Sequence, residues 1–336
     1  MKANDHSFGV KAPLDEGFCP MAIALRAQKE AARKGQGATV GGGCQSAGNR
    51  GRRRMKLTNI SAECFVPDGV EEPAALARTT HMGIGAHQDD LELMAFHGIS
   101  ESFGQADKWF CGVVCTNGAG SPRAGVYAHH SDEQMCAVRR MEQRAAATVG
   151  RYGAMIQLTH PSAVVKNPAD PALKRDLAAL FLAARPEVVY THNAADKHDT
   201  HVAVMGATLA ALRSLPAECR PARVLGCEMW RDLDWLPDRS KVVLDVSGRQ
   251  NLASALAGVF DSQITGGKRY DLAVLGRRRA NATFFESHGV DQAEMIAFAM
   301  DLTPLLLDPG LSISTYVEGL MDAFKAEVKG KLSPWK

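Results

Sequence analysis

Two segments about a hundred residues apart share one pattern, and that pattern restricts the folds open to the chain. Each begins with a short apolar run, passes through a polar turn that holds His and Asp, and continues as a segment typical of a helix. The first covers residues 81–94 and the second residues 186–204. In an open α/β sheet such turns lie at the carboxyl ends of strands, where ligands bind. The sequence therefore predicts two strand ends that build one site.

Strand-like and helix-like segments alternate along the rest of the chain. Strands are predicted over residues 109–116, 154–158, 223–230 and 241–246. Helices are predicted over residues 133–150, 170–184, 201–215, 251–260 and 314–328. This alternation predicts an α/β fold, with a Rossmann-like, mostly parallel sheet and helices on both faces. No Gly-x-Gly-x-x-Gly follows the first strand, so a dinucleotide-dependent enzyme is not expected.

Composition narrows the class of protein further. The chain has 336 residues, is 46% hydrophobic and carries a net charge of +2, which gives no general attraction to nucleic acid. No apolar run reaches the length of a membrane span, and no secretory signal is visible. The eight cysteines form no Cys-x-x-Cys pair. We therefore expect a cytoplasmic protein with reduced thiols and no nucleic-acid partner.

Residues 1–54 differ in composition from the rest. They contain scattered Gly and end on Arg50, Arg52, Arg53 and Arg54. We predict a flexible basic N-terminal extension; a basic arm that touches a partner or folds over the site remains the other reading. Residues 55–336 are predicted to form a single domain.

The polar turn of the first segment offers groups for metal and proton chemistry. His87 and Asp90 are three residues apart, so a turn that enters a helix directs both toward one point. Asp89 projects differently and keeps its carboxylate free. In the second segment His198 and His201 share one face of the first helical turn. The two turns together predict a site with metal ligands and a separate proton carrier.

At these residues the chain resembles the LmbE-like (PIG-L type) N-acetylglucosaminyl deacetylases. Their first signature reads Ala-His-Pro-Asp-Asp, and residues 86–90 read Ala-His-Gln-Asp-Asp. Their second signature is Asp-x-His-x-x-His, and residues 196–201 read Asp-Lys-His-Asp-Thr-His. Gln88 replaces the usual Pro, and Thr200 replaces the Asp that often precedes the last His. Neither change removes a ligand.

The resemblance implies His87, Asp90 and His201 as metal ligands and Asp89 as general base. Two imidazoles and one carboxylate leave Zn²⁺ an open position for water, although Fe²⁺, Co²⁺ or Mn²⁺ accept the same ligands. His198 is expected to stabilise the oxyanion or act as acid, with Asp196 or Asp199 fixing its tautomer.

Weaker candidates lie elsewhere in the chain. Arg123 occupies a Gly-rich loop where the family frequently has a substrate-binding Arg, while Arg278 and His288 are candidates for contacts to a substrate anion. Arg139 and Glu142 have helical spacing, for which a structural salt bridge is the stronger interpretation.

These features favour a zinc-dependent hydrolase that removes the acetyl group from an N-acetylglucosamine-type amino sugar or its conjugate. The pair His198-Asp199 also fits an HD-type metal-dependent phosphohydrolase. A third reading is a non-catalytic, sugar-binding Rossmann-like module, against which the intact Asp89 argues. The sequence leaves a homo-oligomer open.

Overall fold

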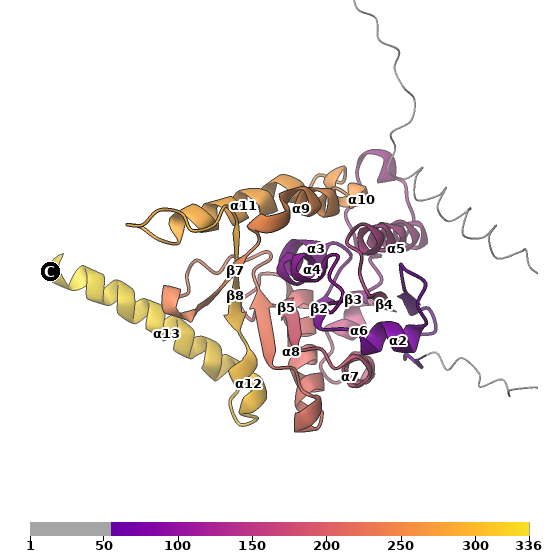
Figure 1. Ribbon diagram of the computed structural model, residues 1–336, viewed down its shortest axis with the longest axis horizontal. Helices are drawn as coiled ribbons and strands as arrows, with labels where there is room; N and C mark the ends of the chain where they lie inside the picture. Colours follow the sequence, from indigo (N-terminus) through magenta and orange to yellow (C-terminus); the bar gives the residue numbers. More distant parts are fainter. Residues whose placement is uncertain (1–54, 336) are drawn as a thin grey trace, which may run out of the picture. The chain divides into compact units, whose positions relative to one another are not determined.

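The computed structural model describes residues 55–335, which form an α/β fold around one eight-stranded sheet (Figure 1). The strands are β1 (Glu63–Phe65), β2 (His81–Gly85), β3 (Phe110–Thr116), β4 (Ala154–His160), β5 (Val188–His192), β6 (Arg223–Cys227), β7 (Lys241–Asp245) and β8 (Ile296–Asp301). Across the sheet they follow the order β1-β4-β3-β2-β5-β6-β8-β7. Strands β4 to β6 in this order are parallel, whereas β1 pairs antiparallel with β4. The predicted mostly parallel sheet is confirmed; the predicted extension over residues 1–54 lies outside the described residues.

Helices cover both faces of the sheet, as the sequence predicts. One face carries α2 (Glu72–Ala77), α6 (Ser162–Val165), α7 (Ala172–Ala184), α8 (Asp199–Arg213) and α12 (Thr303–Leu307). The other carries α3 (Asp90–Met94), α4 (Phe96–Ser102), α5 (Asp132–Val149), α9 (Gln250–Ala257), α10 (Asp261–Ile264) and α11 (Tyr270–Phe284). Each face has its own buried apolar cluster, so the sheet lies between two hydrophobic cores. Within the described part of the chain, no helix is both long and apolar enough to cross a membrane.

Two elements at the far side of the sheet were not predicted. Strand β8 is antiparallel to both β6 and β7, and α11 precedes it. The β8 sequence Ile-Ala-Phe-Ala-Met-Asp contains one β-branched residue, so its propensity does not distinguish a strand from a helix. In α11 the three consecutive Arg obscure the helical period. Helix α13 (Ile313–Leu332) is longer than predicted at both ends.

The central strand β2 delivers the first polar turn. It pairs in parallel with β3 and β5, and all its residues are buried, as expected for a strand covered on both faces. A Cβ added to Gly85 would lie 3.1 Å from the Cβ of Asp90. The missing side chain at the strand end therefore lets the first turn of α3 pack closely, which fixes the position of Asp90.

Helix α5 brings a third segment to the same place. Ser131 caps its start, because the Ser131 side chain accepts from the backbone N–H of Gln134 and the Gln134 side chain accepts from the N–H of Ser131. The face that α5 buries includes Met135, Arg139 and Gln143. Two polar side chains are thus directed into the core beside the turn that follows β2.

Candidate metal centre

The turn after β2 and the first turn of α8 meet, as the sequence predicts. Nδ1 of His87 lies 3.3 Å from Nε2 of His201 and 3.4 Å from Oδ2 of Asp90. Nε2 of His201 lies 3.5 Å from Oδ1 of Asp90. The donor groups of three residues therefore converge on one point, two from the turn after β2 and one from α8, more than a hundred positions later.

The spacing of these donors fits a tetrahedral metal ion. With metal–ligand bonds of about 2.0–2.1 Å, two ligands of a tetrahedral ion are separated by about 3.4 Å. The three observed separations, between 3.3 and 3.5 Å, match this value. Two imidazoles with one carboxylate form a donor set suited to Zn²⁺ and neighbouring divalent ions. His87, Asp90 and His201 would hold such an ion.

Asp90 is held in its ionised form. Its Oδ2 accepts from the backbone N–H groups of Ala86 at 2.9 Å and His87 at 2.7 Å. Burial alone would raise the pKa of Asp90, but its interactions with His201 and then His192 outweigh burial and hold that pKa well below the usual range. The carboxylate is thus preorganised for a cation before any ion binds.

His192 is a site residue that the sequence reading missed. It is the last residue of β5, its ring stacks on His201 with centroids 3.8 Å apart, and its Nε2 lies 3.3 Å from Oδ2 of Asp90. Burial and then the charge of His201 lower its pKa to about 4, so the imidazole is neutral. A His at the carboxyl end of a central strand was the available signal, but it was assigned to the strand itself.

Asp196 contacts a different histidine from the one expected. Its Oδ1 lies 3.4 Å from Nδ1 of His201 and also accepts from the backbone N–H of His198 at 2.9 Å. The prediction that Asp196 fixes the tautomer of His198 is therefore corrected: its carboxylate faces the ring of His201. A carboxylate on Nδ1 leaves Nε2 free to ligate, a common arrangement around metal-bound histidines. Asp199, the other candidate, is exposed at the start of α8.

A second set of donors, His192, Asp196 and His201, also lies close enough to hold an ion. It shares His201 with the first set, so the two sets compete for one ring. The first set is favoured because it uses Nε2 of His201 and leaves Asp196 to orient Nδ1.

His198 stands beside the ligands without joining them. Its ring centroid lies 5.0 Å from that of His87 and 4.7 Å from that of His201. Burial, followed by the charges of His201 and His87, lowers the pKa of His198. A half-buried, neutral imidazole is thus available next to the cluster.

Asp89 is the second carboxylate of the turn, and its surroundings differ from those of Asp90. It has a φ of +118°, an unusual value for a residue other than Gly. Its N–H donates to Oε1 of Gln143 at 3.3 Å, and its carboxylate pairs with Arg139 at 3.2 Å. Burial raises the pKa of Asp89 to about 6, although the charge of Arg139 opposes the shift. Two side chains of α5, Arg139 and Gln143, thus hold the strained backbone and the carboxylate of Asp89 in place.

Arg139 belongs to the site as well as to its helix. It is 1% exposed, pairs with Glu142 at 3.7 Å as predicted, and donates to the backbone carbonyl of Gln88. The purely structural interpretation of the pair Arg139–Glu142 is therefore incomplete, since the same guanidinium contacts Asp89. An Arg on the apolar face of α5 was the sequence signal for this role.

A buried hydrogen-bond chain supports Asp89 from behind. Gln143, which accepts from Asp89, donates through Nε2 to Oε1 of Glu92 at 2.8 Å. The hydroxyl of Tyr152 donates to the same oxygen at 2.6 Å. Burial raises the pKa of Glu92 to about 8. These residues were not predicted as part of the site.

The weaker candidates do not join the cluster within residues 55–335. Arg123 pairs with Asp132 and donates to the carbonyl of Ala119 at 2.9 Å. His288 is exposed after α11. Arg278 is buried and donates to the carbonyls of Glu92 and Leu93, at 3.2 and 2.9 Å. Its guanidinium closes the end of α3, whereas the sequence suggested an exposed Arg that contacts an anion.

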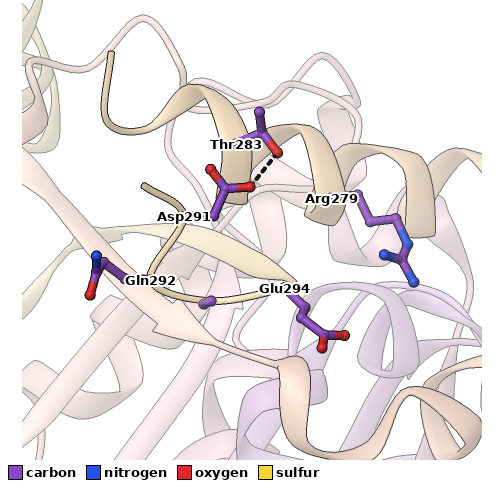
Figure 2. Close-up of a pocket in the computed structure, with 6 residues that line it drawn as sticks. Arg279, Thr283, Asp291, Gln292 and Glu294 are labelled. Carbon is purple, nitrogen blue, oxygen red and sulfur yellow. Dashed lines mark hydrogen bonds between the residues drawn. The ribbon is translucent and has the colours of Figure 1, made fainter. Parts of the chain in front are cut away.

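One polar hollow of the described surface lies away from the cluster. It has a volume of about 450 Å³ and is lined by residues at the end of α11 and before β8, as Figure 2 shows. Thr283 and Asp291 are bonded to each other there at 2.9 Å, and Arg279 donates to Gln250 at 2.8 Å. Its lining includes none of the converging metal donors, so it gives no separate candidate for the reaction.

Comparison with known proteins agrees with this geometry. The family model described as PIG-L, GlcNAc-PI de-N-acetylase, matches residues 82–212, which contain both polar turns and α5. No curated protein sequence matches the chain significantly.

Solved structures share the fold. A conserved protein from Thermus thermophilus has a TM-score of 0.51 and 18% identity, over 69% of this chain and 98% of that one. GalB, the 4-carboxy-2-hydroxymuconate hydratase from Pseudomonas putida, has a TM-score of 0.51 and 16% identity, over 66% and 95%. The N,N'-diacetylchitobiose deacetylase from Pyrococcus horikoshii has a TM-score of 0.51 and 16% identity, over 68% and 86%. Residues 82–212 are thus similar to the PIG-L family, and the fold of the chain is shared with these solved structures.

Proposed function

We propose that this chain is a metal-dependent deacetylase that hydrolyses the N-acetyl group of an N-acetylglucosamine-type amino sugar or its conjugate. The observation that carries the proposal is the pairing of two unlike carboxylates in one turn. Asp90 faces two histidine nitrogens at metal-ligand spacing, while Asp89, next to it, faces Arg139. The family match is to a de-N-acetylase, and one fold neighbour is named a deacetylase of an N-acetylated sugar.

Each residue has a role in amide hydrolysis. When bound, a divalent ion such as Zn²⁺ supplies a polarising charge for the amide carbonyl and lowers the pKa of a water. Asp89, with a pKa raised to about 6, accepts the proton of the attacking water near neutral pH and returns it to the leaving amine. His198 donates a hydrogen bond to the oxyanion. Asp196 keeps His201 oriented.

The fold alone does not select this reaction, since the Pseudomonas protein that shares it is named a hydratase. The two carboxylates are what favours hydrolysis with a distinct general base. The phosphohydrolase alternative has less support, because Asp199 is exposed and belongs to neither set of converging donors.

The test is acetate release from N-acetylglucosamine, its phosphorylated forms and small aglycone conjugates by Zn²⁺-loaded protein. Replacing Asp89 by Asn keeps the side-chain shape and removes the base, so we expect acetate release to fall by about 10²–10⁴-fold. Metal content, measured by atomic emission, is expected to stay at the wild-type value because Asp89 is not a ligand.

Asp107→Asn serves as the matched control, since Asp107 is exposed in the loop that leads into β3 and belongs to neither set of converging donors. It is expected to retain the wild-type rate. A wild-type protein that holds zinc and releases no acetate from any member of the panel contradicts the proposal. Undiminished acetate release by Asp89→Asn contradicts the assigned base.

A further inference from the structure

Helix α13 is the longest helix of the described chain, yet it is largely uncovered. It spans Ile313–Leu332, and none of its residues is buried. Only its first half contacts the core, through partly buried apolar residues: Ile313, Tyr316, Val317 and Leu320. Figure 1 shows the second half extending beyond the sheet, with the C-terminus at its far end. The packing that normally stabilises a helix in a protein is thus missing from the second half.

The second half nevertheless carries an apolar face. The exposed residues are Met321, Phe324, Val328 and Leu332, followed by Trp335. They recur every three or four positions, so they lie along one side of the helix and continue the line of Val317. We call these five residues the α13 stripe. Exposure reaches 55% at Met321 and 84% at Trp335. A continuous apolar stripe of this kind is typical of an interaction surface.

We propose that the α13 stripe pairs with the α13 stripe of a second copy of this chain, with the two helices antiparallel. Charge is the observation that selects this partner. The first half of the helix carries the acidic residues Glu318 and Asp322. The second half carries the basic residues Lys325, Lys329 and Lys331, and its one acidic residue, Glu327, pairs with Lys331. A helix whose two halves carry opposite charge is complementary to itself only when the second copy is reversed.

One register satisfies these charges together. It places Ala323 opposite Phe324 of the second copy, and hence Asp322 opposite Lys325. In the same register Glu318 stands opposite Lys329 of the second copy. Two-fold symmetry repeats both pairs, which gives four opposite-charge contacts along one flank of the stripe. In a parallel pair each charged residue would instead lie beside the same residue of the second copy, so that like charges would repel.

In the same register the stripe residues of the two copies interleave along the interface. Met321, Phe324 and Val328 of one helix stand at levels that fall between the stripe residues of the other, next to its Ala326, Ala323 and Gly319. Apolar side chains that alternate in level in this way allow two helices to interdigitate. Asp322, Lys325 and Lys329 have no hydrogen-bond or ion-pair partner for their side chains within residues 55–335, so they are available for these contacts.

Sedimentation velocity of the full chain tests the proposal. We expect the wild type to sediment as a dimer at micromolar concentration and Phe324→Glu to sediment as a monomer. Leu272→Glu is the matched control, because Leu272 is an exposed apolar residue on α11. It is expected to remain dimeric. Far-UV circular dichroism of each variant verifies that the fold is retained.

A charge exchange tests the register. Asp322→Lys alone places like charges opposite each other and is expected to weaken association at least about tenfold. Combining it with Lys325→Asp in the same chain restores both pairs and is expected to restore the dimer. A monomeric wild type overturns the proposal. This holds whether the α13 stripe then proves to bind residues 1–54 of the same chain or a lipid surface. Dimers that survive Phe324→Glu overturn it as well, and failure of the exchange to restore association overturns the register.

Discussion

Asp89 and Asp90 are neighbours in sequence but differ in pKa, and their contacts explain the difference. Asp90 receives two backbone N–H groups and faces imidazoles, whereas Asp89 is buried against a single guanidinium. The pKa of Asp90 is therefore held low while that of Asp89 is raised to about 6. Pairs of carboxylates with separated pKa values are typical of acid–base sites, because one stays ionised while the other exchanges protons.

Arg139 is expected to set the pH range of the reaction. Its positive charge lowers the pKa of Asp89, so replacing Arg139 by Gln removes that opposition and raises the pKa. Since Asp89 acts as a base in its ionised form, the acid limb of kcat/KM against pH is expected to move to higher pH. At pH 6 the variant is expected to lose at least about tenfold in kcat/KM. The measurement is the pH profile of acetate release.

Arg144→Gln is the control for this prediction. Arg144 lies on the same helix α5 but pairs with Glu63 near the sheet edge, so its removal leaves the surroundings of Asp89 unchanged. We expect its pH profile to coincide with that of the wild type. An acid limb that stays in place in Arg139→Gln contradicts the electrostatic role of Arg139.

The residues that sequence reading identified and missed differ in how their chemistry appears locally. His87 and Asp90 were candidates because their spacing in a polar turn directs both toward one point, and the resemblance to the deacetylase family implied His201 as the third ligand. His192 and Arg139 were not placed in the site, because one ends an apolar strand and the other has a partner on its own helix. Their contacts depend on three-dimensional approach between separate elements, which no local spacing encodes.

At the scale of elements, parallel pairing of β2 with β5 is what assembles the site. Adjacent parallel strands end at the same edge of the sheet, so the turn after β2 and the residues that lead into α8 are brought together. Helix α5 then adds Arg139 and Gln143, which both contact Asp89. These elements were predicted because their periods are clear, whereas β8 was missed because an Ala-rich run lacks a strand signature.

The end of α7 has a strained backbone, and this strain is expected to affect the stability of the protein. Arg185 ends α7 with a φ of +47° and ψ of 55°, the left-handed region that favours Gly. Its N–H still donates to the carbonyl of Phe181 at 2.8 Å, so the cap survives replacement. Arg185→Gly is expected to raise the free energy of unfolding by about 0.5–1 kcal/mol, measured by urea denaturation.

The same substitution inside the helix has the opposite sign. Arg175 is exposed within α7, where the backbone is right-handed. Arg175→Gly is therefore expected to lower the free energy of unfolding by about 1 kcal/mol. Equal effects at the two positions would contradict the left-handed conformation of Arg185.

For the whole molecule, the candidate metal centre joins parts of the chain that are far apart in sequence. His87 and Asp90 follow β2, His201 belongs to α8, and Asp89 is held from α5. An unfolded chain does not keep these donors together, so an ion that binds them binds the folded state. Metal affinity is thus coupled to stability, which makes the ligand set testable without any substrate.

Zinc is expected to raise the thermal midpoint of the whole protein. At a free concentration of one hundred times Kd, binding adds about 2.7 kcal/mol to the free energy of unfolding. For a chain of this size that corresponds to a rise in Tm of roughly 5 °C or more, reversed by a chelator. His201→Gln removes one ligand and is expected to abolish the rise, measured by differential scanning fluorimetry with and without zinc. His288→Gln, which changes an exposed histidine, is expected to keep it. An equal rise in both variants would show that zinc binds elsewhere on the protein and would contradict the ligand set His87, Asp90 and His201.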